Sequence, residues 1–302
     1  MSADLAIVTE GLLKNYGAVR ALRGLDLEVR RGEIYGFLGP NGAGKTTTIR
    51  CLLDLIRPNG GRALVLGMDP QRQSVQVRAR CGYLPGELRL EERFTAEGLL
   101  RHLTALRGRK VDWAYVRQLA QRLDFDLTTP VRSLSKGNKQ KLGLLQALGH
   151  RPELLLLDEP TSGLDPLMQH QVLDILRQVR EQGATVFFSS HIISEVESLA
   201  DRAGIIRNGR LVEVIAPSEL FSRSLRRLRV RCKRQVAFDA LARLPGVQLL
   251  TVYDDRQALL QVEGDMEPFI QALARYPVSD VETERPSLEE VFMAYYRNEE
   301  GK

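Results

Sequence analysis

Residues 34–47 read IYGFLGPNGAGKTT, and this stretch decides the fold of the 302-residue chain. Its first five residues, 34–38, form an apolar run typical of strands that are buried on both faces. Residues 39–47 match the pattern G-x-x-x-x-G-K-[ST], and residues 45–55 are typical of a helix. A buried strand, a glycine-rich loop and a helix in this order predict a βα unit whose loop surrounds phosphate oxygens with backbone N–H groups.

The residue types within the loop indicate how it would hold a nucleotide. Its glycines allow the backbone to curl, the Lys45 ammonium would reach the β- and γ-phosphates, and the Thr46 hydroxyl would bind Mg²⁺. A glycine-rich turn that matches the pattern by chance is the alternative, and the flanking strand and helix argue against it. The loop residues predicted to bind the nucleotide are Gly39, Asn41, Gly42, Ala43, Gly44, Lys45, Thr46 and Thr47.

A second apolar run, residues 154–157, ends at two carboxylates, Asp158 and Glu159. The carboxyl ends of parallel strands meet at one edge of a sheet, so these side chains are expected beside the phosphate loop. Asp158 would hold Mg²⁺ through its water shell, and Glu159 would polarise the attacking water as a general base. Taken alone, the pair could equally be a solvated strand end; the phosphate loop favours the catalytic interpretation.

The remainder of residues 1–225 predicts a mostly parallel sheet with two additions. A further buried strand is expected at residues 185–189, after a helix capped by Asp165. Alternating apolar and polar residues at 25–30 indicate strands with one solvated face, and hence an antiparallel subdomain. Residues 88–149 are typical of helices without strands, which predicts a helical insertion.

The pattern changes again in residues 226–302. Strands are expected at residues 228–234, 247–253, 258–263 and 278–283, and helices at residues 236–244, 266–276 and 287–297. The βαββαβ order predicts a ferredoxin-like unit with a last helix after it. The expected fold class is therefore α/β: a P-loop NTPase core with an antiparallel β subdomain and a helical insertion, followed by a small α+β C-terminal domain.

Composition and charge exclude several classes of protein. Lys and Arg number 43 against 38 Asp and Glu, a net charge of +5, without the blocks of like charge that mark disordered tails. Three scattered cysteines fit neither a disulfide framework nor a zinc cluster, which indicates a reducing compartment. No run approaches the roughly 20 apolar residues of a membrane span, and the N-terminus lacks signal-peptide features, so we expect any membrane role to depend on a partner.

With these motifs, the chain resembles the ATP-binding subunits of ABC transporters over about residues 5–220. LSKGNKQ, residues 134–140, stands where the family has its signature LSGGQ, and SGLD, residues 162–165, resembles the D-loop. His191 resembles the switch histidine, and Tyr16 occupies the place of the aromatic residue that stacks on adenine. PSLEEVF, which begins at Pro286, is similar to a segment of members that export drugs, antibiotics, lipids or polysaccharides.

The resemblance implies a motor subunit that binds ATP and Mg²⁺ and hydrolyses ATP. Two copies, or one copy and a paralogue, would assemble head to tail, so that each signature closes over the ATP held by the other copy. A separate membrane-spanning subunit would be the partner, at the cytoplasmic face of the membrane. The residues implied in catalysis are Glu159, His191 and Lys45; the signature residues implied in ATP binding are Ser135, Gly137 and Asn138.

The sequence departs from the family pattern at two places. Lys136 replaces the first central glycine of the signature, and Asn138 replaces its glutamine. Gly86 stands where most members have a glutamine that touches the metal and the partner protein. The neighbouring Glu87 is a candidate to take over part of that role.

Residues 222–234 hold seven basic residues and no acidic one. This composition favours a solvated strand face. Attraction to an anionic lipid surface is the second interpretation, and nucleic-acid binding is the weakest because stacking aromatics are missing.

Two other functions are alternatives to the transporter motor. One is an ATPase of the same family that acts on a ribosome or nucleic acid. A nucleotide sensor that does not hydrolyse ATP is disfavoured by Glu159.

Overall fold

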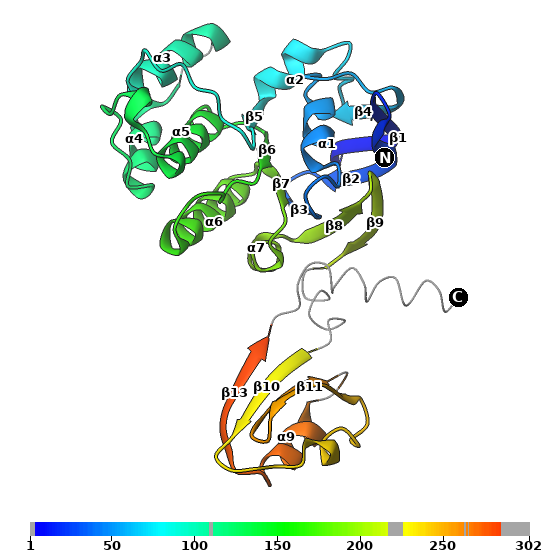
Figure 1. Cartoon of the computed structure of the whole chain (residues 1–302). Coiled ribbons are helices and arrows are strands. Elements are labelled where there is room, and N and C mark those ends of the chain that lie inside the picture. Colours follow the sequence, from blue (N-terminus) through cyan, green and yellow to red (C-terminus); the bar gives the residue numbers. More distant parts are fainter. Residues whose placement is uncertain (1–3, 109–110, 217–225, 263, 265, 285–302) are drawn as a thin grey trace. The chain divides into compact units, whose positions relative to one another are not determined.

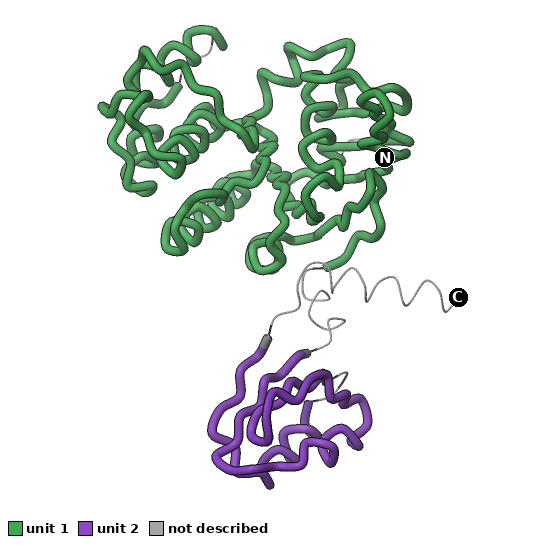
Figure 2. The backbone as a smooth tube through the Cα atoms, viewed as in Figure 1, with its two compact units in different colours: residues 1–216 green, residues 217–302 purple. Residues whose placement is uncertain are grey.

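The computed structural model describes residues 4–108, 111–216, 226–262, 264 and 266–284. The chain separates into two compact units, residues 1–216 and 217–302 (Figure 2). Within the described ranges, no helix combines the length and the apolar character that crossing a membrane requires.

A six-stranded sheet forms the centre of the first unit (Figure 1). Its strands lie in the order β5 (Cys81–Leu84), β6 (Leu154–Asp158), β7 (Thr185–Ser190), β3 (Ile34–Leu38), β8 (Arg202–Arg207) and β9 (Arg210–Ile215). The first five are parallel and β9 is antiparallel to β8. Every residue of β3, β6 and β7 is buried, which confirms the three predicted buried strands.

Two helices of this unit begin where the sequence predicts. Helix α1 (Lys45–Leu52) follows the phosphate loop, but the predicted end at residue 55 is wrong because the chain turns at Asp54, whose φ is 51°. Helix α6 (Pro166–Glu181) begins at its predicted cap: the Met168 N–H donates to Asp165 Oδ1 over 3.0 Å.

A three-stranded antiparallel sheet, in the order β2 (Val19–Arg30), β1 (Leu5–Tyr16), β4 (Gly60–Val65), lies on the other side of α1, which contacts β2 and β4 as well as β6. In β2, Leu25, Leu27 and Val29 are buried while the residues between them are exposed, as their alternation predicts. The main apolar core lies between the two sheets and includes residues of both sheets and of α1. Helix α2 (Ser74–Arg80) leads from this sheet into β5.

The described residues of 88–149 form helices and no strand, as expected. They are α3 (Ala96–Arg107), α4 (Trp113–Arg122), the 3₁₀ helix η1 (Val131–Ser133) and α5 (Lys136–Leu148). Thr95, Asp112 and Ser135 cap the three α-helices with side-chain oxygens, which is the usual task of these residue types at helix starts. The chain returns to the core sheet at β6, and α7 (Ile193–Leu199) follows β7.

The described residues of the second unit form a four-stranded antiparallel sheet and one α-helix. The strand order is β11 (Val247–Asp254), β12 (Gln257–Val262), β10 (Arg226–Cys232), β13 (Val278–Glu284). Helix α9 (Glu267–Leu273) packs Phe269 and Leu273 into a separate apolar core with the buried residues of the sheet.

One predicted helix of this unit is wrong and another lies outside the described residues. Residues 236–244 contain only a 3₁₀ turn, η2 (Phe238–Ala240). The Leu241 N–H donates to the Phe238 carbonyl oxygen and the Leu244 N–H donates to the Leu241 carbonyl oxygen, so this segment forms successive tight turns instead of an α-helix. The last predicted helix, residues 287–297, falls beyond the described ranges.

Candidate functional site

The phosphate loop joins β3 to α1, and its glycines are required for two different reasons. Gly42 and Gly44 have φ values of 80° and 113°, a region that favours glycine. A Cβ atom at Gly39 would lie 2.5 Å from the Ile206 carbonyl oxygen, and one at Gly44 would lie 2.8 Å from the Ala21 carbonyl oxygen. Since Gly44 caps α1 without a side chain, the first N–H groups of the helix suit an anion.

Lys45 places a buried cation inside the loop. Its ammonium donates to the carbonyl oxygens of Gly39, over 2.6 Å, and Pro40, over 3.2 Å. Burial lowers the pKa of Lys45, and the negative charges of Glu159 and Asp158 oppose that shift. A cation in this position can offset the charge of a bound phosphate.

Asp158, at the end of β6, is only 2% exposed, and both of its carboxylate oxygens accept hydrogen bonds. The Thr46 hydroxyl donates to Oδ2 over 2.6 Å, and the Ser189 hydroxyl donates to Oδ1 over 2.5 Å. Thr46 lies in the first turn of α1 and Ser189 in the neighbouring strand β7. The carboxylate predicted to hold the metal is therefore fixed from two sides.

Glu159 is the next residue and adopts a left-handed backbone conformation, with φ 51°. Its N–H donates to both the carbonyl oxygen and the hydroxyl of Ser189. Its Oε1 lies 2.9 Å from His191 Nδ1 and 3.8 Å from Lys45 Nζ. An ionised Glu159 carboxylate can only accept a hydrogen bond, so this contact requires the His191 proton to be on Nδ1. The structure thus brings Lys45, Asp158, Glu159 and His191 together at the phosphate loop.

The donor set at this site fits Mg²⁺ bound together with a phosphate. Thr46 and Asp158 supply a hydroxyl and a carboxylate oxygen, the ligand types that Mg²⁺ prefers. Across the described part of the chain, no group of three or more His, Cys, Asp or Glu side chains could hold a metal by itself. Two protein oxygens suit an ion that takes its other ligands from a nucleotide and water.

The signature residues are not part of this cluster in the same chain. The Ser135 hydroxyl accepts from the N–H of Asn138 over 3.2 Å and caps α5. A Cβ at Gly137 would lie 2.9 Å from the Gly163 carbonyl oxygen, and the Lys136 side chain also lies against Gly163. Among the described residues, no hydrogen bond joins Ser135, Gly137 or Asn138 to the phosphate loop. The signature segment packs on the D-loop of its own chain.

Tyr16 lies at the end of β1, with 46% of its surface exposed. The adjacent strand β2 approaches the phosphate loop at Ala21, whose carbonyl oxygen would contact a Cβ at Gly44. Lys14 Nζ lies 5.2 Å from the centre of the Tyr16 ring. Tyr16 is therefore an exposed aromatic ring on the hairpin next to the loop.

Gly86 lies directly beside the metal-binding candidate. A Cβ at Gly86 would be 3.0 Å from Asp158 Oδ2. The glycine lets the chain after β5 approach this carboxylate closely, and it leaves Glu87 exposed as the next residue.

Sequence reasoning missed three polar residues that hold the site together. Ser189 binds both Asp158 and the N–H of Glu159, and the parallel pairing of Asp158 with Ser189 would have revealed it. Gln140 donates to the carbonyl oxygens that follow Asp158. Glu195, buried in α7, accepts from the hydroxyls of Thr161 and Ser190. The last two had no signal in the sequence.

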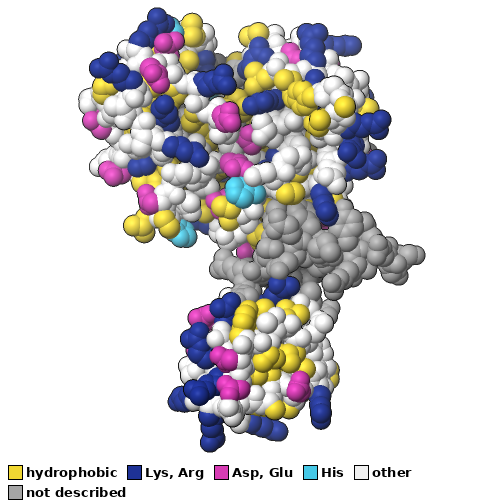
Figure 3. All heavy atoms as spheres, viewed as in Figure 1, with side chains coloured by type: hydrophobic (Ala, Val, Ile, Leu, Met, Phe, Trp, Pro, Cys, Tyr) yellow, Lys and Arg dark blue, Asp and Glu magenta, His cyan; other side chains and the backbone are white. Residues whose placement is uncertain are grey.

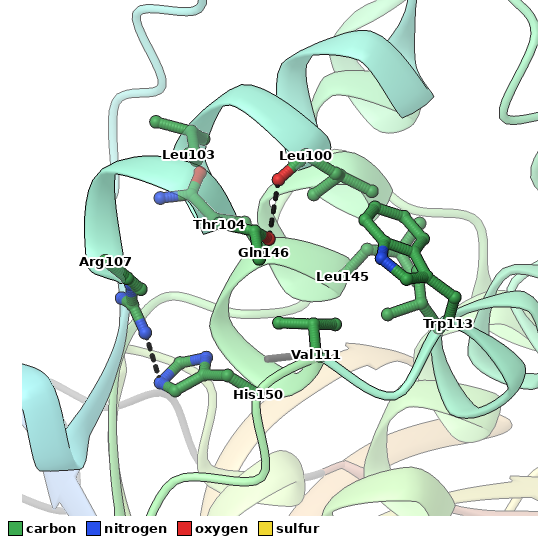
Figure 4. A pocket seen from close by; sticks show the side chains of 11 residues that line it. Leu100, Leu103, Thr104, Arg107, Val111, Trp113, Leu145, Gln146 and His150 are labelled. Carbon is green, nitrogen blue, oxygen red and sulfur yellow. Dashed lines mark hydrogen bonds between the residues drawn. The ribbon is translucent and has the colours of Figure 1, made fainter. Parts of the chain in front are cut away.

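A small pocket among α3, α4 and α5 is a different place from the phosphate loop (Figure 4). Its volume of about 20 Å³ is enough for a single water molecule. It therefore does not compete as a nucleotide site. The labelled residues that line it include Leu100, Arg107, Trp113, Leu145 and His150.

The basic strand of the second unit faces an acidic strand. In the register of β10 and β13, Arg229 lies opposite Glu282 and Arg231 lies opposite Asp280. Arg231 NH1 and Asp280 Oδ2 approach to 3.9 Å. Basic and acidic side chains also lie side by side on the visible face of this unit (Figure 3). This pairing offsets positive charge and favours the solvated-face interpretation for residues 226–234; residues 222–225 of the basic segment lie outside the described ranges.

Comparison with known proteins agrees with this geometry. The family described as ABC transporter matches residues 22–162. The chain is 36% identical over 306 residues to the daunorubicin resistance ATP-binding protein DrrA3 of Streptomyces coeruleorubidus, with 96% of each chain covered. It is 38% identical over 231 residues to the bacitracin transport ATP-binding protein BcrA of Bacillus licheniformis, with 76% of each covered.

A solved structure described as an ATP binding subunit of an ABC transporter has a TM-score of 0.66 and 30% identity, and the match covers 71% of this chain and 91% of that one. The family expected from the motifs is thereby confirmed. The chain belongs to the ABC transporter family, as an ATP-binding subunit that hydrolyses ATP to drive transport.

Proposed function

We propose that this chain is the motor of an exporter and works as a head-to-tail dimer, of two copies or with a paralogue, that holds two ATP molecules between its subunits. The observation that carries the proposal is the division of the site. Lys45, Glu159 and His191 lie at the phosphate loop, whereas Ser135 and Gly137 lie against the D-loop of the same chain. A second subunit would bring its signature residues to complete the pocket.

Each residue of the cluster has a proposed role toward ATP. The loop N–H groups and Lys45 would bind the β- and γ-phosphates, and the Tyr16 ring would stack on adenine. Thr46 and Asp158 would hold Mg²⁺, which offsets charge between the phosphates when it is bound. Ser135, Gly137 and Asn138 of the partner would cover the γ-phosphate. The remaining loop residues, Asn41, Gly42, Ala43 and Thr47, would contact ATP as part of the same loop.

Glu159 is the proposed general base. Its carboxylate would polarise a water molecule whose oxygen attacks the γ-phosphorus, and would accept the proton as the bond to the β-phosphate oxygen breaks. His191, already in contact with Glu159, would hold the γ-phosphate and keep the carboxylate in place. Loss of γ-phosphate contacts would then allow the dimer to open, and this movement would act on the membrane subunit.

The proposed cargo is an antibiotic or drug-like compound. Similarity to the daunorubicin resistance protein extends over 96% of the chain and therefore includes the C-terminal unit. The chain would bind a separate membrane-spanning subunit at the cytoplasmic face of the membrane. The antiparallel order of the four C-terminal strands supports a ferredoxin-like unit in which the first helix is reduced to a 3₁₀ turn.

Glu159→Gln tests the dimer. The variant should bind ATP, hydrolyse it at least roughly 10²-fold more slowly, and accumulate as an ATP-bound dimer by light scattering. Glu181→Gln, at the exposed end of α6, is the matched control and should behave as wild type. A Glu159→Gln protein that remains monomeric with ATP would contradict the shared site.

A resistance assay tests the cargo class. Cells that express this chain with its membrane subunit should survive higher daunorubicin or bacitracin concentrations than cells that carry the Lys45→Ala variant. If cells with the wild-type chain and cells with Lys45→Ala survive the same concentrations of both compounds, neither compound is the cargo.

Glu87→Ala tests whether Glu87 has taken over the role of the missing glutamine. If it has, the variant should show slower transport-coupled ATP hydrolysis. An unchanged rate of coupled hydrolysis would exclude that role.

A further inference from the structure

Gln140 connects the helix that carries the signature to the turn that carries Glu159. Gln140 lies in α5 and is only 6% exposed. Its amide Nε2 donates to the carbonyl oxygen of Glu159 over 2.9 Å and to that of Pro160 over 3.0 Å. Both amide N–H groups are thus used on two consecutive carbonyls, directly after the proposed general base.

Gln140 lies on the same helix as the signature residues, so its contact with Glu159 also connects the signature to that residue. Ser135 caps the helix and Gly137 lies in its first turn, against Gly163. Five residues of helix rise about 7.5 Å, so Ser135 and Gln140 lie less than two turns apart on one rigid segment. A shift of the signature would therefore move the amide of Gln140 with it.

The backbone of Glu159 depends on contacts from outside its own strand. Its φ of 51° is an unfavourable conformation for a residue with a side chain, and such conformations persist when the surroundings fix them. Ser189 holds the N–H of Glu159, and Gln140 holds its carbonyl oxygen. The two peptide groups that set the direction of the Glu159 side chain are thus held by β7 on one side and α5 on the other.

We propose that Gln140 is a positioning residue that transmits closure of the signature over the partner's ATP to Glu159 in its own subunit. The inference rests on the proposed head-to-tail dimer and adds a coupling path between its two ATP sites. Gln140 does not touch the nucleotide in this scheme; it acts through the carbonyl groups of Glu159 and Pro160.

Gln140→Met, of similar length but without a donor, is the first test variant. Its kcat should fall roughly 10- to 100-fold, as expected for misplacement of a catalytic group. Binding of a fluorescent ATP analogue should change less than about twofold, and the Hill coefficient of hydrolysis should approach 1. Gln140→Glu keeps the shape but also cannot donate, and should behave alike. Gln146→Met, on the same helix, is the control and should match wild type.

Mixed dimers distinguish action within a subunit from damage to the signature. Two differently tagged copies are purified together with ATP. In the first arrangement one copy carries both Gln140→Met and Glu159→Gln, and the other copy is wild type. In the second arrangement one copy carries Gln140→Met and the other carries Glu159→Gln. The same two substitutions are present in both, so any loss of stability is shared.

The proposal predicts that the first arrangement hydrolyses ATP at least about tenfold faster, because its intact Glu159 lies in the subunit that keeps Gln140. Equal rates would overturn the proposal. A faster second arrangement would also overturn it, because Gln140 would then act only through the signature on the partner's ATP. Failure of mixed dimers to form with ATP would overturn the proposed dimer, and this inference with it.

Discussion

Asp158 and Ser189 lie opposite each other on the parallel strands β6 and β7, and the Ser189 hydroxyl donates to Asp158 Oδ1 over 2.5 Å. The same hydroxyl accepts from the N–H of Glu159 over 3.1 Å. One small side chain therefore orients the proposed metal carboxylate and also fixes the start of the turn that carries the proposed base. Because the Ser189 hydroxyl binds the carboxylate of Asp158 but only the backbone N–H of Glu159, the two adjacent acidic side chains can have different tasks.

Ser189→Ala should lower ATP hydrolysis roughly 10- to 100-fold and raise the Mg²⁺ concentration required for half-maximal activity, because partners of metal ligands have effects of that size. The measurement is a magnesium titration of the ATPase rate. Ser133→Ala, in η1, is the control: it also removes a serine hydroxyl, but one that does not belong to the site. Identical titrations for the two variants would contradict the role of Ser189.

Glu159→Gly should be more stable than Glu159→Ala by about 0.5–1 kcal/mol, because glycine adopts a positive φ without strain. Both variants should lose hydrolysis. At Glu181, the last residue of α6, the order should reverse and Ala should be the more stable, by less than about 1 kcal/mol because the helix ends there. Denaturant unfolding provides the comparison, and an Ala variant that is more stable at position 159 would argue against backbone strain there.

Ser135→Ala should reduce the free energy of unfolding by about 1 kcal/mol, since it removes the cap of α5. Ser135→Asn keeps a capping side chain and should retain stability within a few tenths of a kcal/mol. If Ser135 also binds the partner's ATP, the Asn variant should be stable and yet slow in hydrolysis. Recovery of full activity by Ser135→Asn would restrict Ser135 to capping.

Lys45 should make stability rise with pH in the alkaline range. Burial lowers its pKa below the ordinary value of 10.5. Between the lowered pKa and 10.5, the unfolded chain therefore binds more protons than the folded chain, and the free energy of unfolding rises with pH. The difference in unfolding free energy between wild type and Lys45→Met should therefore shift in favour of wild type as pH increases through this window. Urea unfolding at several pH values measures it; a flat or opposite trend would contradict the burial of a charged Lys45.

The sequence by itself determined the phosphate loop, the buried strands on which Asp158 and Glu159 depend, and the capped start of α6. These features are local: each is written in a few consecutive residues, and hydrophobic periodicity, glycine conformation and capping chemistry act at that range. Family resemblance then extended the interpretation to His191 and the signature. The predicted helix at residues 236–244 was wrong because this segment packs Phe238 and Leu241 into the apolar core of its unit through tight turns, with the Leu241 N–H bonded to the Phe238 carbonyl oxygen.

Only the tertiary structure decided which residues hold the proposed base in place. Ser189 comes from a neighbouring strand 31 positions from Asp158, and Gln140 comes from a helix 19 positions before Glu159. Neither contact follows from spacing, because strand register and helix packing are set by burial of the whole sheet rather than by the residues that meet. The chemistry of the site could thus be predicted from single motifs, whereas its rigidity arises from contacts that exist only once the sheet and α5 have packed together.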